Sequence, residues 1–540
     1  MGKGNFRYTR RHFLATAAAT AAAAALPFAP IQAAAKFRRY SVTSAMGQKM
    51  LGSYSKGIAA MLKLPPDHPQ NWFRNAFIHI LDCPHGNWWF YVWHRGYLGY
   101  FEQTIRELSG DTDFTIPYWD WTELPEIPPA MFEGVLTPTD KAFEPYTSDL
   151  DVFATYLKPS LISYWNGLSP DQLAQLKVRG YSAFEDVWND VTGYDPATKM
   201  VNVGNEAFAP TSHARYLNSA NPKLDEKTAY DVSPFVVNAG LQLPTDFYNR
   251  EIYLSFSSSK TKSHHEQPGD KTKFSLLEGL PHNKTHNYIG GAGPLDPGPY
   301  GNMTNFLSSV DPIFFLHHAN MDRLWDLWTR IQMSLKRPYL PSGDDLKLLS
   351  DEPFLFYVDG KGKYAGPQAA GSYLSTELFD YDYEPGFGEK LIQQQPGGPT
   401  TLIKGTVSAN VGRITVPRAT IQKYLAAAFQ KPIIVSVSLP HPTGSLSTRE
   451  FDVLVNAPSS VTRVTASSPF YAGTIAFFGS TMGRMNVAHD STFAVPLRKS
   501  LQAFTTLGLD SSTTLQIRVV PTNGRRENTP VLKGVALTAM

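Results

Sequence analysis

The chain has 540 residues, of which 42% are hydrophobic, 13% aromatic and 18% charged. This composition excludes a disordered or fibrous protein, and the length favours two or three domains because one hydrophobic core rarely extends so far. The net charge of +2 is too small to indicate nucleic acid as a partner, and the single cysteine, Cys83, excludes an intrachain disulfide.

The first 35 residues have the pattern of an export signal. Residues 9–14 contain two adjacent arginines, and an alanine-rich apolar run follows at 15–26. Three alanines then offer a cleavage site before Lys36. This segment resembles a twin-arginine signal, so we expect residues 1–35 to be removed and the protein to be periplasmic or secreted. No later apolar run predicts a membrane span, so we expect no stable membrane association after removal.

Residues 36–385 are predicted to form a mainly α-helical core. Apolar residues recur at helical spacing in residues 90–108. A second helix is predicted from Asp311, a good N-cap, followed by Pro312 at the first helical position.

The composition changes after residue 385. Residues 386–401 are rich in Gln, Gly and Pro, which is typical of a linker. Residues 402–540 contain short β-rich runs separated by turn residues, and this pattern predicts a β-sandwich. The clearest of these runs are 433–437, 451–455, 473–477 and 515–520.

Half of the 14 histidines form two clusters along the sequence. The first contains His79, His85 and His94, and the second contains His282, His286, His317 and His318. Histidines four residues apart share one face of a helix and can bind one ion, although such a pair alone is a weak signal. The adjacent pair lies in an apolar run, where each imidazole would cost roughly a few kcal/mol if buried unpaired. Two clusters therefore indicate two metal ions.

Residues 311–325 resemble the second copper motif of tyrosinases, catechol oxidases and molluscan haemocyanins, and residues 79–102 resemble the first, with a conservative departure at Tyr91. The resemblance covers residues 36–385 and implies a type 3 copper oxidase core built on a four-helix bundle. The C-terminal part is similar to that of latent family members. The implied ligands of two copper ions, with O2 as co-substrate, are His79, His85, His94, His282, His286 and His318. His317 and Phe306 are expected to line the site.

Imidazole donors suit several metals, and copper stands at the top of the divalent affinity order. Neither cluster supplies a carboxylate at a plausible ligand position, which disfavours a carboxylate-bound iron site or a hydrolytic zinc site. In fungal, plant and molluscan relatives a cysteine placed like Cys83 forms a thioether with a histidine placed like His85. The alternative for Cys83 is an inert buried thiol.

Glu278 and Asn283 are the candidate catalytic residues. A phenol with a pKa near 10 is ionised in only about one molecule in a thousand at neutral pH, a deficit of roughly 4 kcal/mol. Relatives that hydroxylate monophenols carry a glutamate and an asparagine at these positions, which are thought to orient a proton-accepting water. Alternatively, Glu278 caps a helix and Asn283 is a solvated turn residue.

The C-terminal region is expected to cover the copper entrance, because residues 451–453 resemble a motif that marks such a domain in plant enzymes. Phe477 or Phe478, at the end of a β-run, could project over the site as an aromatic plug. The alternative is that both belong to the sandwich core, and strand alternation favours this for one of them.

The resemblance implies a latent tyrosinase that hydroxylates monophenols and oxidises o-diphenols, with small phenols as substrates. The alternatives are a catechol or o-aminophenol oxidase without hydroxylase activity, or a haemocyanin-like O2 carrier. The sequence does not determine whether the protein forms an oligomer. The remaining histidines are expected on the surface or in loops, with a polar exposed insertion at residues 257–273. They are His12, His68, His213, His264, His265, His441 and His489.

Overall fold

The computed structural model describes residues 35–195, 200–201, 214–266, 272–296, 298, 300–393, 401–426, 433–442, 448–479, 490–497, 501, 503, 513–525 and 529–539. The predicted signal lies outside this part except for its last residue, as do residues 394–400 of the predicted linker and His12, His213 and His489. Among the described residues, no helix combines the length and apolar character needed to cross a membrane. From Phe37 onward the chain forms one compact unit.

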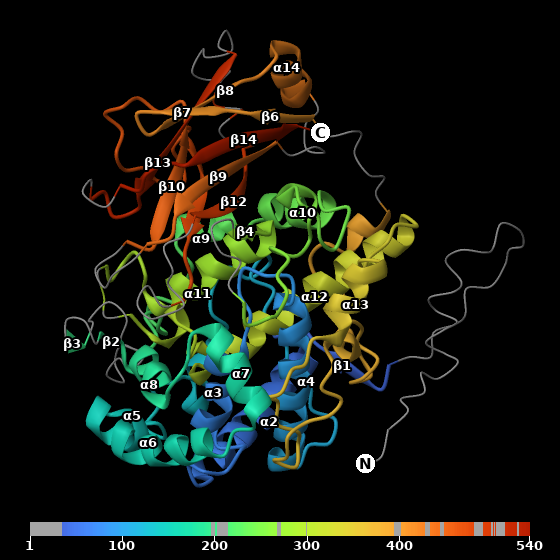
Figure 1. Ribbon diagram of the computed structural model, residues 1–540, viewed down its shortest axis with the longest axis vertical. Helices are drawn as coiled ribbons and strands as arrows, with labels where there is room; N and C mark the ends of the chain where they lie inside the picture. The colour runs from blue at the N-terminus through green and yellow to red at the C-terminus, as the bar shows by residue number, and fades with distance from the viewer. Residues whose placement is uncertain are drawn as a thin grey trace, which may run out of the picture. The chain divides into compact units, whose positions relative to one another are not determined.

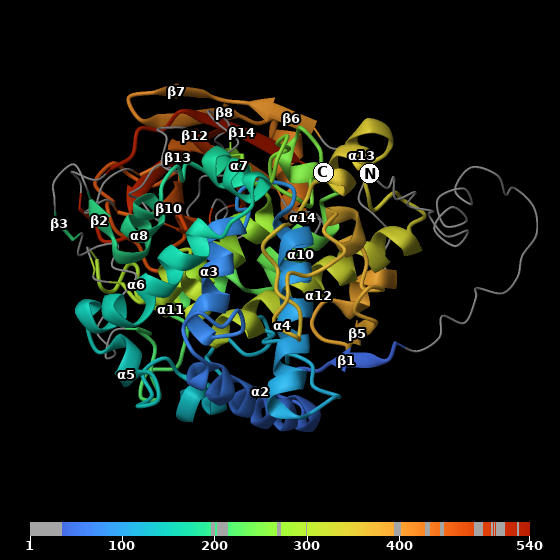
Figure 2. The ribbon, with the colours of Figure 1, turned by 60° about the horizontal axis from the view of Figure 1, so that its bottom comes forward.

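The first part of this unit is helical (Figure 1). Its helices are α2 Ala45–Lys63, α3 Trp72–Asp82, α4 Phe90–Ser109, α5 Glu144–Thr147, α6 Leu150–Asn166, α7 Pro170–Arg179, α8 Phe184–Thr192, α9 Glu226–Asp231, α10 Pro234–Gln242, α11 Asn283–Gly290, α12 Ile313–Ser334 and α13 Gly343–Asp351. Both helices predicted from the sequence, α4 and α12, are present. α4 packs against α2 and α12 (Figure 2).

Local sequence signals explain where these helices begin and end. The Asn71 side chain accepts hydrogen bonds from the first backbone amides of α3, and Asp311 accepts one from the Ile313 amide at the start of α12. α4 ends at Gly110, whose φ of 74° suits the left-handed conformation of a C-cap glycine. Local signals therefore set the starts of α3 and α12 and the end of α4.

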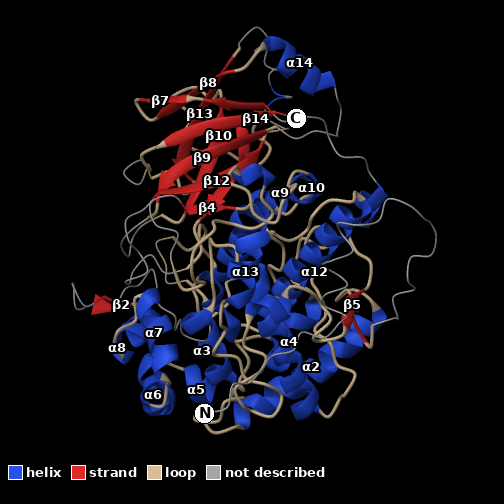
Figure 3. Cartoon of the chain, turned by 45° about the vertical axis from the view of Figure 1, so that its right-hand side comes forward, coloured by secondary structure: helices blue, strands red, loops and turns tan. Residues whose placement is uncertain are grey.

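The C-terminal part consists of strands and one helix, α14 Arg418–Ala426 (Figure 3). The strands are β6 Thr401–Lys404, β7 Thr406–Ser408, β8 Val411–Thr415, β9 Ile434–Pro440, β10 Glu450–Val455, β11 Tyr471–Ala476, β12 Asp490–Pro496, β13 Thr514–Pro521 and β14 Gly534–Ala539. Together with β4, Thr272–Phe274, they form two five-stranded sheets, ordered β11-β10-β13-β8-β7 and β4-β12-β9-β14-β6. The predicted fold class, a helical core followed by a β region, is confirmed.

One strand of the second sheet comes from the helical part of the chain. β4, Thr272–Phe274, pairs in parallel with β12, and Phe274 stacks on Phe493 with ring centroids 4.8 Å apart. The predicted exposed insertion at residues 257–273 is therefore wrong at this end, because Thr272 is buried in the sheet. The other short strands are β1 Phe37–Arg39 paired with β5 Tyr381–Tyr383, and β2 Tyr194–Asp195 paired with β3 Met200–Val201.

A buried charge network fastens β1 and β5 to the helical core. The Asp322 carboxylate of α12 accepts hydrogen bonds from Arg39 at 2.9 Å and Arg95 at 2.7 Å. The hydroxyls of Tyr381 and Tyr383 donate to the same carboxylate. Burial alone would raise the pKa of Asp322, but Arg95 and Arg39 outweigh it and hold the pKa below its ordinary value.

Replacing Asp322 by asparagine is expected to destabilise the fold by about 3–5 kcal/mol, because the buried Arg95 would lose its anion and the buried Arg39 would keep only Glu102. The native contribution is present above pH ~4 and is lost as the pH falls through the lowered pKa. Denaturant unfolding measures both effects. Asp382→Asn is the matched control, since the Asp382–Arg38 pair is exposed and worth less than about 1 kcal/mol. Equal losses in the two variants would contradict a structural role for the network.

Candidate metal centre

The first histidine group lies where α3 ends and α4 begins. Its members are His79 in α3, Cys83 and His85 in the following loop, and His94 in α4, and their ligand atoms lie within 4.8 Å of one another. Nδ1 of His79 donates to the Phe306 carbonyl at 2.6 Å, and Nδ1 of His94 donates to the Phe90 carbonyl at 2.7 Å. These bonds leave both Nε2 atoms unprotonated, 3.4 Å apart.

The second group is carried by α11, α12 and a π-helical turn, Glu278–His282, that leads into α11. Its members are His282, His286, His317 and His318. Nδ1 of His286 donates to the Met303 carbonyl, and Nε2 of His286 lies 3.1 Å from Nε2 of His318. Nδ1 of His282 donates to Oδ1 of Asn283 at 2.9 Å. Nε2 of His286 and Nε2 of His318 therefore converge, as Nε2 of His79 and Nε2 of His94 do in the first group.

Trp121 distinguishes the two adjacent histidines. Its indole N–H, which can only donate, lies 3.1 Å from Nδ1 of His317. Nδ1 of His317 must therefore accept, and the neutral ring carries its proton on Nε2. His318 has no such bond, and its Nε2 faces His286. This geometry favours Nε2 of His318 over Nε2 of His317 as a ligand atom, and the ligand assignment itself stays a prediction.

Burial favours the neutral form of every imidazole in both groups. It lowers the pKa of His79 and of His282 to about 3 and holds the pKa of the other five well below the ordinary value. Nε2 of His282 is buried without a hydrogen-bond partner. Buried lone pairs with no donor are costly unless a cation satisfies them, so this donor set fits metal ions.

The two groups face each other. The rings of His94 and His318 stack with centroids 4.1 Å apart and an interplanar angle of 9°. Across the site, the rings of His85 and His282 are 5.8 Å apart. Metal ions held by the two groups would therefore be neighbours and could act on one molecule between them.

Cys83 approaches the edge of the His85 ring. Its sulfur lies 3.1 Å from Nδ1 and 3.6 Å from Nε2 of that ring, so Cε1, which is bonded to both nitrogens, lies toward the sulfur. Burial raises the pKa of the Cys83 thiol well above its ordinary value. The Cys83 sulfur therefore lies beside the ring carbon as a neutral thiol.

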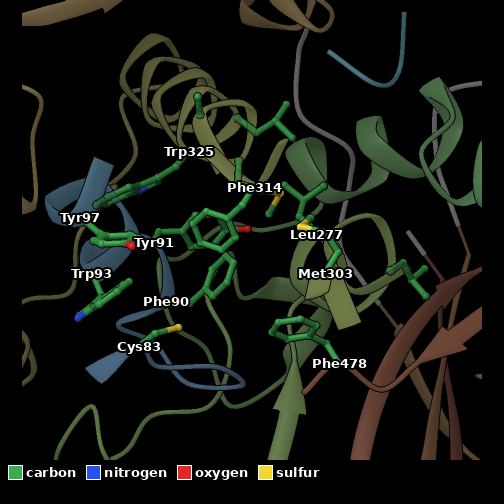
Figure 4. Close-up of a cluster of buried hydrophobic side chains, with 14 of the residues drawn as sticks. Cys83, Phe90, Tyr91, Trp93, Tyr97, Leu277, Met303, Phe314, Trp325 and Phe478 are labelled. Atoms are coloured by element: carbon green, nitrogen blue, oxygen red, sulfur yellow. The ribbon is translucent and has the colours of Figure 1, made fainter. Parts of the chain in front are cut away.

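Phe478 stands over both histidine groups. Its ring centroid is 4.9 Å from His85, 5.7 Å from His282 and 4.3 Å from His286. It also meets Phe306 edge-on at 5.5 Å, so Phe306 lies beside the histidines. Figure 4 shows Phe478 directed into the cluster of buried side chains that contains Phe90 and Met303. A phenyl ring from the β region thus occupies the space in front of the histidines.

Phe477 points the other way, into the sandwich. Its ring contacts those of His441, Phe451 and Phe493 at 5.0–6.0 Å. Of the two candidate plugs, the structure therefore excludes Phe477. Gly479 follows with a φ of +97°, and a Cβ at this position would come within 2.5 Å of Phe306.

The end of β11 is fastened to α11 by two amide side chains. Nδ2 of Asn283 donates to the Ala476 carbonyl at 3.0 Å, and Nδ2 of Asn287 donates to the Phe477 carbonyl at 3.1 Å. Buried ion pairs join the same surfaces, Lys284 with Glu450 and Lys227 with Asp452, each at 2.6 Å. These contacts hold Phe478 in register over the site. The amide of Asn283 is shared between a histidine and the β region, so it is not a solvated turn residue.

Glu278 links the two histidine motifs. Its carboxylate accepts a hydrogen bond from the amide of Gly86, next to His85, at 2.6 Å, and another from the Ser258 hydroxyl. Burial raises its pKa to about 8, although these two bonds act in the opposite direction. A carboxyl group with such a pKa can accept or hold a proton near neutral pH.

Comparison with known proteins identifies the family. Residues 56–331 match the family model described as the common central domain of tyrosinase. The chain belongs to the tyrosinase family. Both histidine groups lie inside the matched residues, whereas Phe478 lies outside them.

Relatives within the tyrosinase family come from plants and bacteria. The chain is 24% identical over 355 residues to a chloroplastic polyphenol oxidase II of Ipomoea batatas, covering 63% of this chain and 48% of that protein. It is 27% identical over 309 residues to a tyrosinase of Hahella sp. (strain CCB-MM4), covering 56% of this chain and 48% of the relative. The chain thus matches about half the length of these relatives.

The fold extends the likeness beyond the central domain. The structure of a recombinantly expressed latent aurone synthase (polyphenol oxidase) aligns with a TM-score of 0.53 at 19% identity, covering 94% of this chain and 90% of that one. At this identity the alignment indicates a shared fold, including the C-terminal β region.

Two histidines outside the motifs are not where the sequence suggested. His264 and His265, expected in an exposed loop, have exposed fractions of 1% and 0%. Carboxylates from distant segments bind them, and a polar local sequence cannot reveal such partners. His68 and His441 do lie in loops, as predicted. Trp121 and Asn287 were missed because neither belongs to a recognisable motif.

Proposed function

We propose that the chain is a copper-dependent phenol oxidase that oxidises o-diphenols to o-quinones and hydroxylates monophenols at the ortho position. The observation that carries this proposal is the pair of facing three-histidine sets, with a phenyl ring, that of Phe478, in front of both. An aromatic side chain in that position is a mimic of a phenol substrate. Small phenols are therefore the proposed substrates.

Copper is the proposed metal. Neither of the two groups includes a carboxylate among the described residues, and all-imidazole sites favour copper over the harder divalent ions. His79, His85 and His94 would hold one ion, and His282, His286 and His318 the other. Bound copper supplies the redox chemistry with O2, whereas the chain orients the phenol, excludes water and handles its proton.

Two residues have proposed roles in the proton step. Glu278, whose buried carboxyl has a raised pKa, would accept the phenol proton through a water. Asn283 would orient that water and also fixes the tautomer of His282. In the full chain the Asn283 amide donates to Ala476, which favours catechol oxidation over hydroxylation until the β region is released.

Latency and export complete the proposal. The β region would keep the enzyme inactive by means of Phe478 until the chain is cut near residues 386–401, and the N-terminal 35 residues would direct twin-arginine export. The proposed domains are residues 1–35, 36–385, 386–401 and 402–540.

Oxygen uptake by the chain trimmed near residue 390, compared on a monophenol and its matching catechol, tests the function. Uptake on both substrates by protein with two coppers per chain supports a tyrosinase. Uptake on the catechol alone would assign a catechol or o-aminophenol oxidase. Reversible O2 binding without turnover would assign a carrier, and zinc in place of copper in active protein would contradict the metal assignment.

Cys83 is expected to form a thioether with His85. The sulfur and Cε1 would each lose a hydrogen as the bond forms, and O2 would take up the two electrons. Peptide mass spectrometry should therefore find the 83–85 peptide lighter by two hydrogen atoms and resistant to alkylation after denaturation. Protein produced without copper is the control and should keep a free thiol. A free thiol in the active copper-loaded enzyme would contradict the crosslink.

A further inference from the structure

A third group of ligand-type side chains lies behind the first histidine group. It consists of Asp82, His264 and His265, all with exposed fractions of 1% or less and with ligand atoms within 4.8 Å of one another. Nε2 of His264 and Nε2 of His265 lie 3.0 and 2.8 Å from the same Asp82 oxygen. Separations between donors in the two catalytic groups are similar, at 3.1 and 3.4 Å.

Outer hydrogen bonds fix two of these three side chains. Nδ1 of His264 donates to Glu352 at 2.6 Å, which directs its Nε2 toward Asp82. The second oxygen of Asp82 accepts the Trp93 indole N–H at 2.6 Å. Histidine ligands of metals commonly donate their other N–H to a carboxylate, and carboxylate ligands are themselves hydrogen-bonded.

Two buried carboxylates give the group its negative charge. Asp82 and Glu352 are buried carboxylates, and among the described residues neither forms an ion pair with a lysine or arginine. The nearby guanidinium of Arg179 donates instead to the carbonyls of Ile80 and Cys83. A doubly protonated His264 would supply one positive charge. A second proton on His265 would leave a charged N–H at Nδ1, a buried atom that has no partner.

We propose that Asp82, His264 and His265 bind a zinc ion that is separate from the binuclear copper centre and shares no ligand with it. Two imidazoles and one carboxylate are a normal zinc donor set, and water would complete the coordination. A divalent cation balances the two carboxylates. The ion would fasten the loop that contains His264 to the end of α3, and so would stabilise the helix that carries His79. Zinc does not change its oxidation state, so no redox step involves this ion.

Metal analysis of the full-length protein, produced with both copper and zinc in the medium, tests the proposal. The expected content is two coppers and one zinc per chain. His265→Gln should lose the zinc, keep both coppers and lower the melting temperature. His68→Gln, a loop histidine outside the group, is the matched control and should keep all three ions.

If the His265 variant does not fold, crystals of the wild-type protein provide a second measurement. An anomalous signal at the zinc absorption edge is expected next to the Asp82 oxygen that faces His264 and His265. Wild-type protein with two coppers and no zinc overturns the proposal and leaves a hydrogen-bonded His264 imidazolium as the alternative. A zinc equivalent that persists in His265→Gln also overturns it. Failure of the zinc proposal can be distinguished from failure of the proposed phenol oxidation. The zinc content tests the first, whereas the copper content and the oxygen-uptake assay test the second.

Discussion

Phe478→Ala is expected to raise catechol oxidation by the full-length chain by about 10- to 100-fold. Burying a phenylalanine ring is worth about 1.5–3 kcal/mol, and each 1.4 kcal/mol corresponds to about a factor of ten in the ratio of covered to open sites. Removing the ring removes that preference while the six histidines and their hydrogen bonds stay intact. The measurement is the initial rate of oxygen uptake with a catechol, with copper content determined on the same samples.

Phe470→Ala is the matched control, because Phe470 lies in the β region on a separate small apolar cluster and does not contact the histidines. This variant should remain latent. Cleavage between residues 386 and 401 should activate the wild-type chain at least severalfold without changing its copper content. If cleavage activates and Phe478→Ala does not, other parts of the β region block the site. If neither activates, the lid hypothesis is wrong.

The two treatments should differ on a monophenol. Phe478→Ala opens the ring position but leaves the Asn283 amide donating to the Ala476 carbonyl, whereas release of the β region frees that amide. Cleavage is therefore expected to raise monophenol hydroxylation, relative to catechol oxidation, more than the substitution does. Equal ratios in the two proteins would remove Asn283 from the coupling between the β region and the proton step.

Much of the site could be predicted because its signals are local. His79, His85 and His94 lie close together in sequence, and so do the runs that contain His282, His286 and His318. The fold class was predictable for the same reason, since helical spacing and short β-rich runs are local patterns. Strand alternation also predicted that one of Phe477 and Phe478 belongs to the sandwich core.

The sequence could not reveal hydrogen-bond partners that lie far apart in the chain and meet only in the tertiary structure. The choice between His317 and His318 depends physically on Trp121, almost two hundred residues earlier in the chain. Polar residues around His264 suggested that it is exposed. In the fold, Asp82 and Glu352, which are distant in sequence, hydrogen-bond both of its ring nitrogens and so offset the free-energy cost of burying it. The edge strand β4 was missed because three residues are too few to show alternation.

Glu278→Gln is expected to lower monophenol hydroxylation by about 100-fold or more and to change catechol oxidation by less than about threefold. Only hydroxylation must overcome the ~4 kcal/mol ionisation deficit of the phenol, and glutamine keeps the shape of the side chain but cannot take up a proton.

The pH dependence separates a role in proton transfer from a structural one. A base acts in its deprotonated form, so with a pKa of about 8 the ratio of hydroxylation to catechol oxidation should rise with pH toward that value. Bound copper ions favour the carboxylate and would move the rise lower. Measured on the trimmed chain, Glu278→Gln should lose this component and keep only the pH dependence that comes from ionisation of the phenol itself.

Ser258→Ala, which removes one hydrogen bond from the carboxylate, should shift the rise to higher pH without abolishing it. Equal losses on both substrates, or an unchanged pH profile in Glu278→Gln, would exclude Glu278 as the proton acceptor.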